Sequence, residues 1–137
     1  MTTYPTRIVH VTIEQDWRSV YDFASRPENM PLWAAGLATG LEREGDDWIA
    51  HGPLGQLRVR FVSANNLGVI DHIVTPEAGP AVYNALRVTP NGSGAEVMFT
   101  LLQVPGMSDT DFAADANAVL NDLQTLKSFL ERQDANG

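Results

Sequence analysis

The most regular hydrophobic pattern in the chain lies near its C-terminal end. Apolar residues recur there at steps of four and three, which places them on one face of an α-helix. Ser108 to Asp111 precede this stripe and resemble the capping box of a helix N-terminus, with an Asp where Glu is usual. The pattern predicts a helix of about six turns that ends near Arg132 and buries one face. The stripe consists of Phe112, Ala116, Val119, Leu123, Leu126 and Leu130.

The N-terminal part of the chain begins with a different period. Residues 7–14 alternate between apolar and polar, which is typical of a β-strand with one buried face. Asp16 then offers an N-cap for a helix. Pro27 and Pro31 break the helical pattern, because proline cannot continue a helix interior. We therefore expect one short helix, a turn, and a second brief helical piece that ends near Trp33.

A series of short alternating segments fills the middle of the chain, separated by turns rich in Gly, Pro, Asn and Asp. This pattern predicts a meander of antiparallel strands. One helix cannot cover so wide a flat sheet, so we expect the sheet to curl around the C-terminal helix and to leave a space between them. The expected strands are residues 38–43, 48–51, 56–62, 68–75, 81–89 and 95–104.

The chain resembles the START-like (SRPBCC) superfamily over nearly its whole length. The resemblance rests on VTIEQDWRSVYDFASRPENMPLW (Val11 to Trp33), GVIDHIV (Gly68 to Val74), LRVTPNGSGAEVMFTL (Leu86 to Leu101) and the terminal helix. Ser25-Arg26 replaces the acidic start that is commoner before the proline turn of bacterial members.

The resemblance implies an α+β helix-grip fold, in which about seven antiparallel strands wrap around the C-terminal helix and enclose a ligand cavity. The expected domain is a single unit over residues 1–137, with a core of about 7–132. Within the superfamily, the chain resembles a bacterial polyketide cyclase/dehydrase-like member of unassigned function. Members of the superfamily carry lipids, bind hormones and aromatic compounds, or cyclise polyketides. The family therefore implies a pocket but no single chemistry.

Composition and charge narrow the range of partners. The chain has 137 residues, no cysteine, and a net charge of −8 from 17 acidic and 9 basic residues. An acidic protein repels phosphate backbones and anionic membranes, so we expect neither nucleic-acid binding nor membrane insertion. The absence of cysteine excludes disulfides and thiolate sites. The three histidines lack metal-ligand spacing, so we expect no metal and no cofactor. The N-terminus resembles no signal peptide, and we expect a cytoplasmic protein.

Asp71 and His72 are the most suggestive neighbours in the sequence. Successive side chains of a strand point to opposite faces, so the two do not form a direct hydrogen-bonded pair without a bulge. Apolar residues flank both of them, and the alternation alone leaves open which one faces the cavity. We favour His72, because a carboxylate costs more to bury than a neutral imidazole. Either residue can also be a hydrogen-bonded structural group.

Five other residues are candidates for contact with a ligand. Trp33 ends the helical piece where family members use an aromatic side chain to line the cavity, and core packing is its alternative. If their strand face is inward, Tyr83 and Arg87 can bind a carboxylate or hydroxyl group; otherwise Arg87 is a surface cation. Met98 and Phe112 are interpreted as cavity lining or as plain core.

These observations favour the binding of a small hydrophobic or aromatic ligand, lipids included, in an internal cavity. The alternative is an enzyme that resembles polyketide cyclases or dehydratases. In that case His72 is a general acid or base, and Arg87 or Tyr83 stabilises an enolate oxygen. A third hypothesis is a partner-binding module that forms a homodimer through apolar residues on the outer sheet face. The enzyme hypothesis requires its three groups to converge on one point of the cavity.

Overall fold

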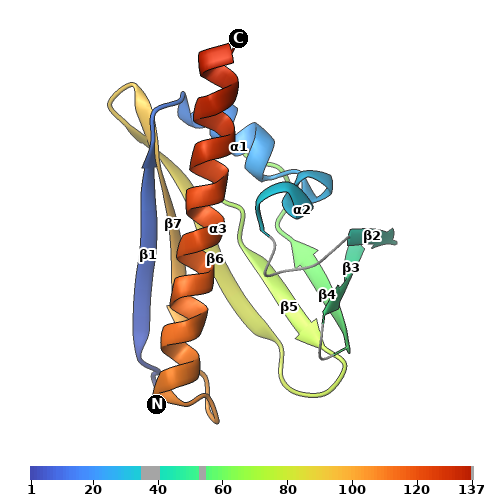
Figure 1. The fold of residues 1–137 in the computed structure, drawn as a ribbon. Helices are drawn as coiled ribbons and strands as arrows, with labels where there is room; N and C mark the ends of the chain where they lie inside the picture. The colour runs from blue at the N-terminus through green and yellow to red at the C-terminus, as the bar shows by residue number, and fades with distance from the viewer. Residues whose placement is uncertain (35–40, 53–54, 137) are drawn as a thin grey trace.

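A seven-stranded antiparallel sheet and a long C-terminal helix dominate the computed structural model, which describes residues 1–34, 41–52 and 55–136 (Figure 1). The strand order is β1-β7-β6-β5-β4-β3-β2. The α+β helix-grip architecture predicted from the sequence is confirmed. The strands are β1 (Thr6–Ile13), β2 (Leu41–Glu44), β3 (Asp47–Gly52), β4 (Gly55–Phe61), β5 (His72–Pro76), β6 (Val82–Asn91) and β7 (Gly94–Leu102).

The helices lie on the concave side of the sheet (Figure 1). They are α1 (Trp17–Ala24), the 3-10 turn η1 (Pro27–Asn29), α2 (Met30–Trp33) and α3 (Asp109–Asn136). Asp16 caps α1 as predicted, since its carboxylate accepts a hydrogen bond from the Ser19 N–H at 3.3 Å. The predicted end of α3 near Arg132 is wrong. The helix continues to Asn136, because neither Pro nor Gly interrupts the sequence before Gly137.

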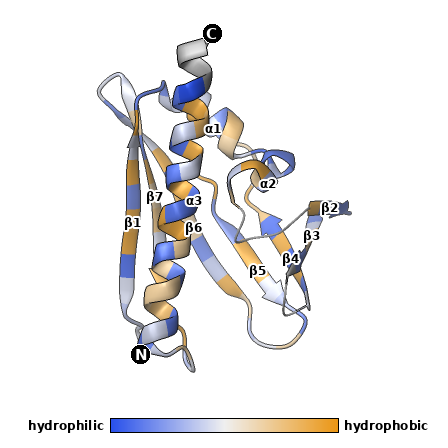
Figure 2. Ribbon diagram, in the orientation of Figure 1, coloured by the Kyte–Doolittle hydropathy of each residue, from blue (hydrophilic) through white to orange (hydrophobic). Residues whose placement is uncertain are grey.

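The core lies between the sheet and α3. Hydrophobic and hydrophilic positions alternate along β1 and recur along α3, as Figure 2 shows. The predicted α3 stripe is buried from Phe112 to Leu130, with Val119 half-buried. On β7, alternate residues from Ala95 to Leu101 are buried against it. The helix face predicted by the 3.6-residue period and the strand faces predicted by the two-residue period therefore pack together in one core.

Strand boundaries differ from the sequence prediction most clearly at the β6–β7 hairpin and at the start of β5. The hairpin between β6 and β7 is tighter than expected, because Asn91 pairs with Gly94 and only Gly92 and Ser93 form the loop. Of the strand expected over 38–43, residues 38–40 lie outside the described part of the chain. The strand expected over 68–75 begins only at His72, with an isolated bridge at Val69. No helix among the described residues is long and apolar enough to span a bilayer.

Candidate functional site

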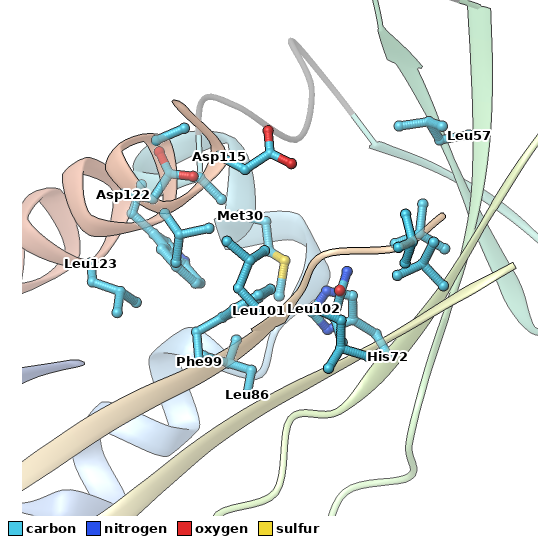
Figure 3. A pocket seen from close by; sticks show the side chains of 18 of the residues that line it. Met30, Leu57, His72, Leu86, Phe99, Leu101, Leu102, Asp115, Asp122 and Leu123 are labelled. Atoms are coloured by element: carbon cyan, nitrogen blue, oxygen red, sulfur yellow. The ribbon is translucent and has the colours of Figure 1, made fainter. Parts of the chain in front are cut away.

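A cavity of about 370 Å³ lies between α3, α2 and the inner face of β4 to β7. Figure 3 shows side chains from the helix and from the sheet pointing into it. Its volume falls within the range of small-molecule sites. Apolar side chains make up most of the wall: Met30, Trp33, Ala34, Leu57, Val74, Val82, Leu86, Phe99, Leu101, Leu102, Val104, Met107, Ala118, Val119 and Leu123. The polar members are His72, Asn84, Asp115 and Asp122.

His72 is buried in the cavity wall, with 2% of its surface exposed. Its ring centroid lies 5.2 Å from that of Phe61 and 6.4 Å from that of Phe99. Nδ1 lies 3.0 Å from the carbonyl oxygen of Ile70, which can only accept, so Nδ1 carries the proton. Burial lowers the pKa of His72, chiefly because desolvation disfavours the imidazolium. The neutral ring therefore has an unprotonated Nε2.

Trp33 supplies a second buried polar atom at the same cavity. Its side chain is 4% exposed and stands at the end of α2, where Pro31 fixes the preceding turn. Neither the indole Nε1–H of Trp33 nor Nε2 of His72 has a hydrogen-bond partner among the described residues. Buried polar groups are nearly always paired, so an unpaired donor and an unpaired acceptor on two lining residues of one cavity are unusual.

Two carboxylates enter the cavity wall from α3. Asp115 and Asp122 lie on the helix side, opposite the sheet side that carries His72 (Figure 3). The pKa of Asp115 is raised, first by desolvation and then by the nearby negative charge of Asp111. The cavity thus combines an apolar interior with negative charge along one helix.

Asp71 lies on the outer face of the sheet and is 1% exposed. Its carboxylate accepts hydrogen bonds from the Tyr83 hydroxyl at 2.5 Å, from Arg87 Nη2 at 2.9 Å and from the Leu86 N–H at 3.0 Å. Desolvation raises the pKa of Asp71, but the bonds from Arg87, Tyr83 and Leu86 together outweigh it, so the pKa is lowered. Asp71 is therefore an ionised group that the side chains of Tyr83 and Arg87 cover.

Asp71 also explains why β5 starts late. In a regular antiparallel pair, opposite residues exchange two N–H to carbonyl bonds. The Ile70 N–H donates to the Leu86 carbonyl at 2.8 Å, but the Leu86 N–H donates to the Asp71 carboxylate. The Ile70 carbonyl instead accepts the His72 Nδ1–H. Asp71 and His72 are thus connected through Ile70, although they make no direct pair.

The structure separates the residues that the sequence proposed as ligand contacts. Trp33 and His72 line the cavity, with His72 inward as favoured. Tyr83 and Arg87 lie on the outer face with Asp71, which is opposite to the inward orientation considered for them. The reason is strand parity: the inner face of β6 carries Val82, Asn84, Leu86 and Val88. The three groups of the enzyme hypothesis therefore do not converge.

Met98 and Phe112 are also outside the cavity lining. Met98 pairs with His10 and Arg87 on the side of β7 opposite its buried residues and is half-buried. Phe112 is buried in the core at the start of α3, where the Arg7 guanidinium lies 5.6 Å from its ring centroid. Phe112 is thus a core residue and not a cavity-lining one.

Sequence reasoning missed Asn84, Asp115 and Asp122 in the cavity wall. Asn84 is a polar residue on the otherwise apolar face of β6, so it could be predicted to line the cavity once the inner face of β6 is known. Asp115 and Asp122 are seven residues apart and share a helix face, next to the apolar stripe.

The outer face exposes several apolar or aromatic side chains. Val62, Ile73 and Tyr83 are 41%, 40% and 50% exposed, and Ile73 pairs with Tyr83 across β5 and β6. This arrangement is compatible with the homodimer hypothesis, which stays a prediction that light scattering would check.

Solved structures of other proteins have a similar fold. No protein-family model and no curated protein matches the chain. A START superfamily protein from Mycobacterium smegmatis is similar with a TM-score of 0.73 and 12% identity, over 93% of this chain and 98% of that one. CalU16 from Micromonospora echinospora gives a TM-score of 0.67 and 14% identity, over 91% of this chain and 73% of that one.

DynU16, a protein in the dynemicin biosynthetic locus, gives a TM-score of 0.72 at 14% identity. The match covers 92% of this chain and 47% of that one, so the chain spans about half the length of DynU16. Identities this low carry the fold and no ligand or reaction. The sheet wrapped around α3 and these likenesses agree with the resemblance found in the sequence: the chain has the START-like helix-grip fold.

Proposed function

We propose that the protein binds a small hydrophobic or aromatic molecule in the cavity under α3. The observation that carries this proposal is an apolar cavity of about 370 Å³ lined by Trp33 and His72, each of which has a buried side-chain nitrogen without a partner among the described residues. A few placed polar groups in an apolar wall are typical of small-molecule sites. The likeness to a START superfamily protein supports the same function.

Displacement of a neutral fluorescent probe tests this proposal. N-phenyl-1-naphthylamine should bind with increased emission, and apolar competitors should displace it. Val74 lines the cavity, whereas its neighbour Ile73 is 40% exposed on the outer face. Val74→Phe should weaken probe binding by roughly tenfold through overpacking, and Ile73→Phe should leave it unchanged. No saturable binding, or equal affinities of the two variants, would overturn the proposal.

An enzymatic function is a second candidate, favoured by His72 alone. Its imidazole is neutral, its tautomer is fixed by the Ile70 carbonyl, and Nε2 is free of protein partners in the described chain. Such a nitrogen can remove a proton next to a carbonyl group. If His72 acts in this way, the protein should accelerate deuterium exchange at the α-carbon of 2-tetralone, followed by NMR, and His72→Phe should abolish the acceleration. An exchange rate equal to that of buffer would exclude this function for that ketone class.

A further inference from the structure

The two unpaired atoms of the cavity have opposite hydrogen-bonding roles. Nε2 of His72 can only accept while the ring is neutral, because the proton resides on Nδ1. Nε1 of Trp33 can only donate, because an indole nitrogen has no available lone pair. Both side chains are more than nine-tenths buried, so neither atom reaches bulk solvent without a rearrangement. A complementary ligand therefore presents both a donor and an acceptor.

A hydroxyl group has both properties, since it donates one hydrogen and accepts through its lone pairs. An ether or a ketone oxygen can satisfy Trp33 but leaves Nε2 of His72 unpaired. A hydrocarbon leaves both atoms unpaired. Both nitrogens are unpaired in the ligand-free protein, so a ligand with the donor gains a hydrogen bond at Nε2 that other ligands cannot make, and the cavity wall favours it.

The charges of the cavity wall discriminate against anions. Asp115 and Asp122 contribute carboxylates, and no Lys or Arg is among the described lining residues. Residues 35–40 and 53–54, outside the described part of the chain, contain no Lys or Arg in the sequence either. A ligand carboxylate would lose its hydration without a cation beside it and would face the carboxylates of Asp115 and Asp122, which is strongly unfavourable.

From this arrangement we infer the class of ligand: an uncharged aromatic or similarly rigid apolar molecule with a hydroxyl group, which donates to Nε2 of His72, while the Nε1–H of Trp33 donates to a ligand oxygen. Phenols belong to this class, and fatty acids and other carboxylates do not. The inference rests on the proposed binding function, because it assumes that the cavity takes a ligand. It adds the polarity and charge of that ligand.

Four naphthalene probes of similar shape test the inference on the wild-type protein at pH 7. Naphthalene has no polar group, 2-methoxynaphthalene can accept only, 2-naphthol can donate and accept, and 2-naphthoate is an anion. Competition against N-phenyl-1-naphthylamine gives each dissociation constant. We expect 2-naphthol to bind about tenfold more tightly than 2-methoxynaphthalene, as for one hydrogen bond to an otherwise unpaired group, and 2-naphthoate to bind most weakly.

Two variants assign the discrimination to named residues. His72→Phe keeps an aromatic ring between Phe61 and Phe99 but removes the acceptor, so the preference for 2-naphthol over 2-methoxynaphthalene should fall to roughly twofold or less. Asp115→Asn should strengthen 2-naphthoate binding relative to naphthalene. Asp22→Asn, an exposed acidic position on α1, is the control for total charge and should not change that ratio.

The outcomes separate the two proposals. If N-phenyl-1-naphthylamine itself shows no saturable binding, both the binding function and the ligand class are wrong. If it binds and none of the four probes displaces it, the ligand class is wrong and the binding function stands. If naphthalene or 2-methoxynaphthalene binds as tightly as 2-naphthol, or 2-naphthoate binds more tightly, the cavity binds ligands but the inferred class is wrong. The wild-type series decides this even if His72→Phe does not fold.

Discussion

Replacement of Asp71 is the most informative perturbation of this molecule, because its carboxylate connects the outer face of the sheet with the cavity. In Asp71→Ala, the Leu86 N–H, the Tyr83 hydroxyl and the Arg87 guanidinium lose their shared acceptor. The side chain of Arg87 is 54% exposed and Tyr83 is 50% exposed, so both can hydrate again. The Leu86 N–H is buried and cannot.

The expected magnitude follows from these exposures. One buried donor is left without an acceptor, either the Leu86 N–H or, where that N–H takes the Ile70 carbonyl, the His72 Nδ1–H, and this costs about 2 kcal/mol. The loss of the half-exposed charged and phenolic bonds adds about 1 kcal/mol after solvent screening. Urea denaturation should therefore show a decrease of about 3 kcal/mol in the free energy of unfolding for Asp71→Ala. Asp71→Asn keeps an acceptor for Leu86 and should lose only about 1 kcal/mol.

A second measurement reports the effect inside the cavity. Without the carboxylate, the Leu86 N–H can pair with the Ile70 carbonyl, as in a regular ladder, and compete with the His72 Nδ1–H for it. The ¹⁵N chemical shifts of the His72 ring should then move from the pattern of a single Nδ1–H tautomer toward a mixture of tautomers. This change would not occur if Asp71 were only a surface ion-pair residue.

Asp47→Ala is the matched control for this experiment. Asp47 is also a buried carboxylate, and it accepts bonds from Arg58 at 3.0 Å and Arg60 at 2.6 Å, but it has no connection to His72. Its replacement should lower stability and leave the His72 ring shifts unchanged. Two results would refute the reasoning: an Asp71→Ala protein with wild-type stability and ring shifts, or the same ring-shift change in Asp47→Ala.

Two further predictions concern Gly68 and the pH dependence of stability. Gly68 has φ +75°, and an added Cβ would lie 2.0 Å from the Val88 carbonyl oxygen, so Gly68→Ala should lower the free energy of unfolding by about 3 kcal/mol or more. Gly92 is the control, because it has φ +59° and nothing lies within 4 Å of its Cβ position. Gly92→Ala should lower the free energy of unfolding by only about 1 kcal/mol. Equal losses of the two variants in urea denaturation would contradict the steric argument. Burial lowers the pKa of His72 below its ordinary 6.5. At pH values below 6.5 the unfolded chain therefore takes up a proton that the folded chain does not. The free energy of unfolding should decrease as the pH falls, by at most about 1.4 kcal/mol per pH unit. Thermal or urea unfolding of wild type and His72→Phe between pH 7 and 5 should show this slope in the wild type and a smaller slope in the variant.

Local patterns were sufficient to predict the elements of the fold. The period of the stripe from Phe112 to Leu130 and the alternation on β1 depend only on near neighbours in the sequence, and both are confirmed. The inward position of His72 also followed from a local argument, the higher cost of burying a carboxylate. The premise of that argument did not hold, because Asp71 is 1% exposed and His72 is 2% exposed. Tyr83 and Arg87 cover the carboxylate from the outer face and supply the bonds that stabilise its charge.

The candidate site was less predictable, because it depends on which strands become neighbours. The orientation of Tyr83 and Arg87 follows from the face of β6 that packs under α3, and the alternation of that segment does not select a face by itself. The contact of Asp71 with Leu86 requires the register between β5 and β6, in which His72 pairs with Asn84. Register depends on how two segments pair, so it cannot be predicted from the sequence of either segment alone.

The dipeptide Asp71-His72 therefore acts across the sheet rather than as a direct pair. Asp71 takes the Leu86 N–H on one side, which leaves the Ile70 carbonyl for the His72 Nδ1–H on the other. That second bond determines which ring nitrogen is unprotonated, and so it makes the cavity wall an acceptor at this point. A residue outside the cavity thus sets the hydrogen-bonding role of a residue inside it. It follows that an outer-face change at Asp71 should alter the preference for hydroxylated ligands, although the Asp71 side chain bonds only to the backbone N–H of a lining residue, Leu86.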